Sequence, residues 1–168
     1  VDRTNHPRED DLMPPATPPQ PDESQILEDL RRNPAVLQRV QELTGPELHI
    51  QNQLRKEFPD AIVRAALSLV ELRHKAAGKF TRAAEMWFDR QGFEQSTAEL
   101  VARHKAQRFE GEVWDLCCGI GGDTIALAEH NCHVHAVDAN PAACLRAKWN
   151  AEVYGVSDRV TTHCRTVE

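Results

Sequence analysis

The sequence has no apolar run that approaches the length of a membrane-spanning helix. It also shows no charged-then-apolar signal segment at its start. Cysteine is present, but without any CxxC pair, and the count is odd: Cys117, Cys118, Cys132, Cys144 and Cys164. A zinc site or a disulfide framework is therefore not expected. We expect a protein of the reducing cytoplasm, with no metal and no membrane partner.

Positive charge is outnumbered by negative charge: 20 Lys and Arg residues stand against 26 Asp and Glu residues. The net charge of −6 argues against a generic nucleic-acid-binding surface. Between Glu71 and Arg108, however, eight Lys and Arg residues stand against five Asp and Glu residues, a local excess of +3. This excess fits a phosphate-facing surface. It equally fits a solvated helix surface laced with ion pairs, and the sequence alone leaves both interpretations open.

Composition divides the chain into three parts. Residues 1–23 hold six prolines and the acidic run Glu9-Asp10-Asp11, which predicts a disordered tail, with a polyproline ligand as the less favoured alternative. Residues 24–108 show apolar residues at helical spacing, broken at Asn33-Pro34, Gly45-Pro46 and Phe58-Pro59. We expect about four short helices there. Ser96 to Glu99 fits a capping box that opens a further helix.

Residues 109–168 alternate between strand and helix patterns. Strands are predicted at about 112–117, 133–137 and 159–164, with helices at about 123–130 and 142–154. Asn140-Pro141 caps the second helix, and Gly155 ends it. This alternation predicts an α/β fold: the helical region is followed by the first half of a doubly wound Rossmann-like sheet. We therefore expect the chain to be the N-terminal portion of a longer protein. The competing interpretation is a complete three-strand domain, which would expose an apolar edge.

The most informative stretch runs from Glu112 to Thr124. An apolar strand ends at Asp115, and a turn with three glycines follows before the helix. Asp138 ends the second predicted strand, 23 residues after Asp115, where a carboxylate can bind the two hydroxyls of a ribose. A G-x-G-x-x-G dinucleotide motif would need glycine at Thr124. The acid at Asp115 suits a cofactor that carries an amino group, such as S-adenosylmethionine. A tight packing turn with a solvent-exposed Asp138 is the competing interpretation.

The segments Asp115–Thr124, Val137–Pro141 and Asn150–Gly155 resemble class I S-adenosylmethionine-dependent methyltransferases. Within that superfamily they resemble the trimethylguanosine synthase group and bacterial relatives with a THUMP-like domain. The resemblance covers about residues 79–168. It implies that Asp115 and the glycine loop bind the methionine part of the cofactor, and that Asp138 binds its ribose. The cofactor-binding residues it implies are Thr97, Asp115, Cys117, Gly119, Gly121, Gly122, Asp123, Thr124, Asp138, Ala139 and Asn140.

The resemblance also implies an RNA substrate, methylated at a guanine N2 atom. The catalytic Asn/Asp-Pro-Pro-aromatic motif of the family is absent from this sequence, so we assign no catalytic residue and expect little or no activity from this chain alone. Two alternatives remain open. One is a small-molecule or protein methyltransferase on the same fold, and the other is a non-catalytic adaptor. Cys117 stands where many members of the superfamily have glycine. We expect Cys117 and Cys118 to be buried packing residues.

Overall fold

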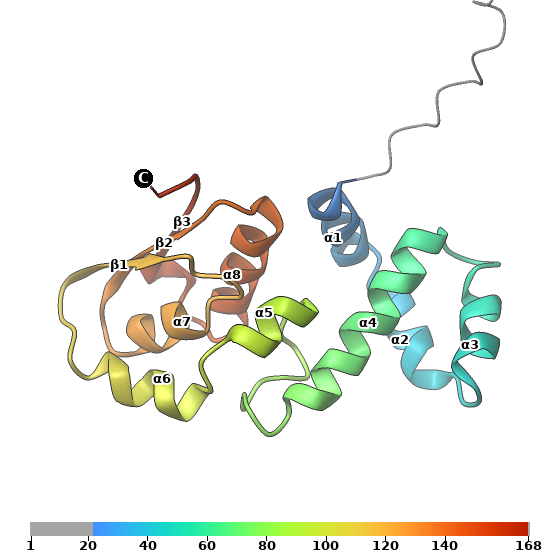
Figure 1. Cartoon of the computed structure of the whole chain (residues 1–168). Coiled ribbons are helices and arrows are strands. Elements are labelled where there is room, and N and C mark those ends of the chain that lie inside the picture. Colours follow the sequence, from blue (N-terminus) through green and yellow to red (C-terminus); the bar gives the residue numbers. More distant parts are fainter. Residues whose placement is uncertain (1–21, 168) are drawn as a thin grey trace, which may run out of the picture.

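The computed structural model describes residues 22–167. Most of the predicted tail lies outside this range. Glu23, its last residue, is already the first residue of helix α1 (Glu23–Arg32). Three more helices follow: α2 (Pro34–Glu42), α3 (Glu47–Leu54) and α4 (Asp60–Ala76). Pro34 occupies the first turn of α2, where its missing N–H costs nothing. The helices α1, α2 and α3 all pack against α4, the longest of the four (Figure 1).

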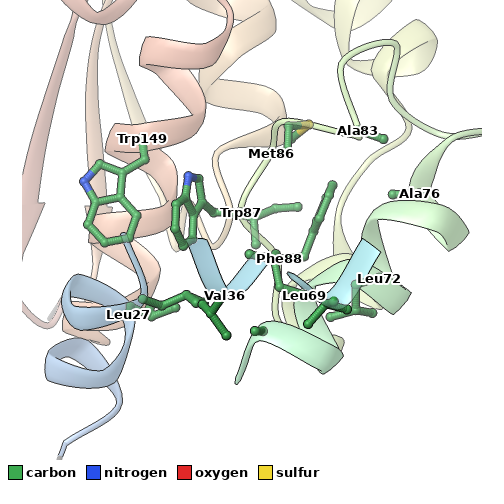
Figure 2. Close-up of a cluster of buried hydrophobic side chains, with 14 of the residues drawn as sticks. Leu27, Val36, Leu69, Leu72, Ala76, Ala83, Met86, Trp87, Phe88 and Trp149 are labelled. Carbon is green, nitrogen blue, oxygen red and sulfur yellow. The ribbon is translucent and has the colours of Figure 1, made fainter. Parts of the chain in front are cut away.

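The core of this helical region continues into the rest of the molecule. The segment after α4 contributes Met86, Trp87 and Phe88, which are at most 8% exposed. Figure 2 shows Trp149 beside Trp87, with Phe88 on the other side of Trp87 and the leucines of the helices below them. The rings of Trp87 and Trp149 meet edge to face, with centroids 4.8 Å apart. Because Trp149 belongs to helix α8 (Pro141–Val153), one apolar core joins the helical region to the α/β region.

The α/β region is built on three parallel strands in the order β1-β2-β3. They are β1 (Glu112–Leu116), β2 (His133–Asp138) and β3 (Val160–Cys164), and the 3-10 turn η2 (Ser157–Arg159) leads into β3. Helices α7 (Gly122–Glu129) and α8 pack against the sheet, and α6 (Glu99–Ala106) packs against α7 (Figure 1). The α/β fold with a helical N-terminal region is thus confirmed.

Two predicted helix starts have different outcomes. Asn140 caps α8 as predicted: its side-chain oxygen accepts a hydrogen bond from the Ala142 N–H at 2.9 Å. The predicted capping box at Ser96–Glu99 is wrong. The N-cap of α6 is Ala98, and no side chain caps this helix. The Ser96 hydroxyl instead donates to the Phe93 carbonyl at 2.9 Å, in the segment after helix α5 (Arg90–Gln95).

The carboxylate of Glu99 is used elsewhere because it is buried, at 7% exposure. It accepts hydrogen bonds from the Thr81 N–H at 2.6 Å and from the Tyr154 hydroxyl at 2.8 Å. Burial alone would raise the pKa of Glu99, but these hydrogen bonds outweigh burial and hold the pKa below its usual value. Glu99 therefore ties α6 to the segment after α4 and to the end of α8.

Candidate functional site

The loop between β1 and α7 is a tight turn that is hydrogen-bonded to the carboxyl end of β2. The Gly121 N–H donates to the Cys118 carbonyl at 2.9 Å, and the Cys118 N–H donates to the Val137 carbonyl at 2.9 Å. Gly121 has a φ of 83° and precedes the first residue of α7. A Cβ atom there would lie 3.0 Å from the Ala147 Cα, so both the backbone conformation and the close approach of α8 require glycine.

Cys117 adopts a φ of 62°, a conformation that favours glycine, and it is exposed. The prediction that Cys117 is a buried packing residue is therefore wrong, because the left-handed turn directs this residue out of the core. Cys118 is buried as predicted. Burial raises the pKa of the Cys118 thiol far above its usual range, with Asp115 and Asp138 adding to the effect, so this thiol is unreactive near neutral pH.

Asp115 sits at the carboxyl end of β1. It accepts a hydrogen bond of 2.5 Å from the hydroxyl of Thr124, a residue with no solvent exposure. Burial raises the pKa of Asp115, and the neighbouring Asp123 raises it further. The hydrogen bond from Thr124 and the charge of Lys105 oppose this rise. The buried Thr124 hydroxyl thus fixes the position of the Asp115 carboxylate.

Asp138, at the carboxyl end of β2, is bound directly to the glycine loop. Its Oδ2 atom accepts a hydrogen bond from the Gly119 N–H at 2.9 Å, and Oδ1 accepts one from the Asn140 N–H at 2.9 Å. Each carboxylate oxygen retains a further lone pair for a ligand. The two features that carry the sequence prediction, the loop and the acid at the end of β2, therefore lie in direct contact.

Thr97, in the segment before α6, lines the site and contacts the first turn of α7. Its hydroxyl donates to Asp123 Oδ2 at 2.9 Å. The Nζ atom of Lys105, on α6, lies 2.7 Å from Asp123 Oδ1 and donates to the Thr97 hydroxyl at 3.2 Å. Lys105 was missing from the predicted site because the sequence places it among surface bases. Its neighbours come from segments that meet only in the folded chain.

Asp115, Thr97, Asp123 and the glycine loop line a cavity of about 190 Å³. Six of the predicted residues line it, together with Gly92, Gln95 and Ser96 from α5 and the segment after it. A hollow of about 410 Å³ shares Leu116 with this cavity and continues to Val137 and to residues 165–167, which follow β3. The predicted residues that line the cavity are Thr97, Asp115, Cys117, Gly119, Gly122 and Asp123; those that do not are Gly121, Thr124, Asp138, Ala139 and Asn140.

The basic residues of 71–108 are largely engaged within the protein. Arg103 forms ion pairs with Glu99 and Glu129, both at 2.9 Å. The Arg73 guanidinium donates to the carbonyls of Glu85 and Met86. Together with Lys105, these residues favour the ion-paired interpretation of the local positive charge over a free phosphate-binding surface. Between residues 22 and 167, no helix has the length and apolar character needed to cross a membrane.

The arrangement of β1, glycine loop, α7 and an acid at the end of β2 is that of a nucleotide-type binding site on an α/β fold. Comparison with known proteins shows which class of protein the chain is similar to. Residues 111–168 match the family described as RNA cap guanine-N2 methyltransferase. An uncharacterized S-adenosylmethionine-dependent methyltransferase of Mycobacterium tuberculosis is 34% identical over 92 residues, which cover 51% of this chain and 26% of that protein.

An uncharacterized RNA methyltransferase of Nitratidesulfovibrio vulgaris is 31% identical over 138 residues, which cover 77% of this chain and 27% of that protein. The chain thus spans about a quarter of the length of these relatives. Among solved structures, a protein of Porphyromonas gingivalis described as a methyltransferase has a TM-score of 0.59 at 19% identity. That match covers 85% of this chain and 35% of the other, and it supports the fold.

Proposed function

We propose that the protein is an S-adenosylmethionine-dependent methyltransferase of the cytoplasm that acts on RNA at a guanine N2 atom. The observation that carries the proposal is the hydrogen bond from the Gly119 N–H to Asp138. It joins the loop that would pass under the nucleoside to Asp138, the acid that would bind the ribose. The family match supports this activity, and the names of the two relatives support its coarser parts, an S-adenosylmethionine-dependent methyltransferase and an RNA methyltransferase.

The charges of the site suit this cofactor. S-adenosylmethionine carries a sulfonium and an ammonium group but no phosphate. Asp115 at the cavity wall would accept hydrogen bonds from the ammonium group, and Asp138 would bind the ribose hydroxyls. Ala139, Asn140 and the hollow that begins at Leu116 would take the adenosine side. The protein's part in the reaction is to hold the methyl carbon in line between the sulfur and the acceptor nitrogen.

The RNA substrate is the finer part of the proposal. It rests on the family match, on the relative named as an RNA methyltransferase and on a resemblance to the trimethylguanosine synthase and THUMP-like-domain group. The ion pairs that engage Arg103 and Lys105 are the observation that favours a second candidate, a methyltransferase for small molecules or proteins, because they remove positive charge from the surface.

Calorimetry with S-adenosylhomocysteine tests the cofactor. We expect the chain to bind it, and we expect Asp138→Ala to weaken binding by about 30-fold or more, because charged hydrogen bonds to the ribose are lost. Asp158→Ala, an exposed aspartate in η2, is the matched control and should leave the affinity unchanged. Failure of the unaltered chain to bind, or equal affinities for Asp138→Ala and the unaltered chain, would remove the basis for this function.

Transfer of a radioactive methyl group distinguishes the substrates. A full-length protein that contains this chain would be incubated with labelled S-adenosylmethionine and total RNA, and the RNA would be digested to nucleosides. Label in N2-methylguanosine supports the proposal. Label in another nucleoside corrects the methylated atom, and label only in protein or small-molecule fractions favours the second candidate.

A further inference from the structure

Lys105 forms one corner of a closed triangle of polar groups. Its ammonium nitrogen lies 2.7 Å from Asp123 and 3.2 Å from the Thr97 hydroxyl, and that hydroxyl lies 2.9 Å from the other oxygen of Asp123. The three residues come from α6, from the start of α7 and from the segment before α6. Each group therefore restrains the other two, and the triangle fixes α6 against the first turn of α7.

Two corners of this triangle, Thr97 and Asp123, line the cavity that also contains Asp115. Lys105 itself lines a second cavity, of about 220 Å³, which shares Asp115 and Asp123 with the first. We propose that Lys105 is a positioning residue of the cofactor site: through Thr97 and Asp123 it holds the wall against which the amino-acid end of the cofactor rests. This inference rests on the proposed function and adds a residue that the sequence prediction did not include.

Charge gives Lys105 a second effect on the same site. Asp115 and Asp123 are two neighbouring carboxylates, and the charge of Asp123 disfavours the ionised form of Asp115 and raises its pKa. The groups that act on Asp115 are Asp123 and Thr124 of α7 and Lys105 of α6, and the thiol of Cys118 lies in its field. Asp138 of β2 also faces that thiol. Lys105 is the cation that lowers the pKa of Asp115.

Loss of Lys105 should move the pH dependence of cofactor binding to higher pH. Loss of Lys105 removes a group that lowers the pKa of Asp115, so the pKa rises and a larger fraction of Asp115 is protonated at a given pH. A protonated Asp115 cannot bind an ammonium group as an anion. In a Lys105→Met variant, binding of the cofactor should therefore weaken and should recover only at higher pH than in the unaltered chain. A lysine that merely packed α6 on α7 would weaken binding without moving this pH dependence.

The first test uses the ligand-free chain. The carboxyl carbon of Asp115 is followed by NMR as a function of pH in the unaltered chain, Lys105→Met, Lys105→Arg and the control Lys56→Met, an exposed lysine after α3. We expect the Asp115 titration to move to higher pH only in Lys105→Met. A titration that is unchanged in Lys105→Met would overturn the electrostatic part of the proposal.

The second test measures the affinity for S-adenosylhomocysteine from pH 5 to pH 9 by calorimetry. Lys105→Met should weaken binding about tenfold near pH 7, the loss of roughly one charged interaction, and Lys105→Arg should restore most of it. Thr97→Val, which removes one corner without a change in charge, should weaken binding without moving its pH dependence, and this variant decides the case if Lys105→Met does not fold.

The outcomes separate the two proposals. If the unaltered chain does not bind S-adenosylhomocysteine, the proposed cofactor is wrong and the role of Lys105 in its site is wrong as well. If the unaltered chain binds but Lys105→Met and Thr97→Val bind equally well, the cofactor proposal stands and the positioning role is overturned.

Discussion

The helical region and the α/β region differ in where they keep their polar groups. In α1–α4 the buried side chains are apolar, and ion pairs within these helices, such as that between Arg32 and Glu28, lie at the surface. The pair that Glu23 of α1 forms with a buried partner involves Arg146 of α8. Among the described residues, every polar or charged residue that is buried lies between positions 99 and 150: Glu99, Thr124, Arg146 and Asn150. Buried polar groups are costly unless each is hydrogen-bonded. None of these four residues lies in α1–α4, so the buried polar side chains belong to α6 and the α/β region.

Asn150 is the strongest test of this contrast, because it joins the two regions. Its side-chain oxygen accepts from the Trp87 N–H at 2.7 Å, and its amide nitrogen donates to the carbonyls of Trp87 and Ile120. Asn150→Leu leaves these groups buried without partners and should lower the free energy of unfolding by about 3 kcal/mol or more. Urea unfolding measures this loss. Asn52→Leu, an exposed asparagine on α3, should change it little, and equal losses would break the comparison.

Gly92 tests the same contrast at the wall of the cavity. A Cβ atom there would lie 2.4 Å from Ile120 Cγ2 and 2.8 Å from Asp89 Oδ2. Gly92→Ala should therefore displace α5, lower the free energy of unfolding by about 2 kcal/mol and weaken binding of S-adenosylhomocysteine. At Gly78, in the turn after α4, a Cβ would meet nothing within 4 Å. Thermal unfolding should show a clear loss for Gly92→Ala and almost none for Gly78→Ala; similar melting temperatures would contradict the close packing of α5 on the loop.

A substitution at Cys117 should stabilise the protein rather than destabilise it. Cys117→Gly removes the steric cost of a left-handed backbone and should raise the free energy of unfolding by about 1 kcal/mol. Asn131→Gly, at the other non-glycine residue with positive φ in the described chain, should gain less, because asparagine tolerates this conformation. Chemical denaturation of both variants checks the order. A destabilised Cys117→Gly would mean that the thiol makes a favourable contact that outweighs the strain.

The surface ion pairs of α1 should show the smallest effect. Arg32 pairs with Glu28 and Asp29, but its own side chain is 62% exposed. Arg32→Ala should lower the free energy of unfolding by about 0.5 kcal/mol or less, and by still less at high salt. Urea unfolding at two salt concentrations measures this. A loss as large as that of Asn150→Leu would remove the distinction between the two regions.

The sequence predicts the parts of the site that are local in the chain. Strand, glycine turn and helix follow one another between residues 112 and 130, and the start of α8 is marked by the adjacent residues Asn140 and Pro141. The groups that the sequence could not predict depend on distant partners. The spacing of Ser96 and Glu99 indicates a capping box, but the partner of Glu99 is Thr81, 18 residues away. In the sequence Lys105 resembles any surface lysine, because its contact with Asp123 forms only when α7 packs beside α6.

The tryptophans give the junction of the two regions and the sheet separate fluorescence signals. Trp87 and Trp149 are in edge contact at the junction of the two regions, each at most 8% exposed, and the guanidinium of Arg31 lies 4.6 Å above the Trp149 ring. Trp114 lies on β1 and is 48% exposed. Emission from the buried pair should shift to longer wavelength when α1 separates from α8. Emission from Trp114 should already lie at longer wavelength, because this side chain is exposed to water. A Trp114→Phe chain would therefore let fluorescence follow the opening of the junction alone, in real time and without an added label.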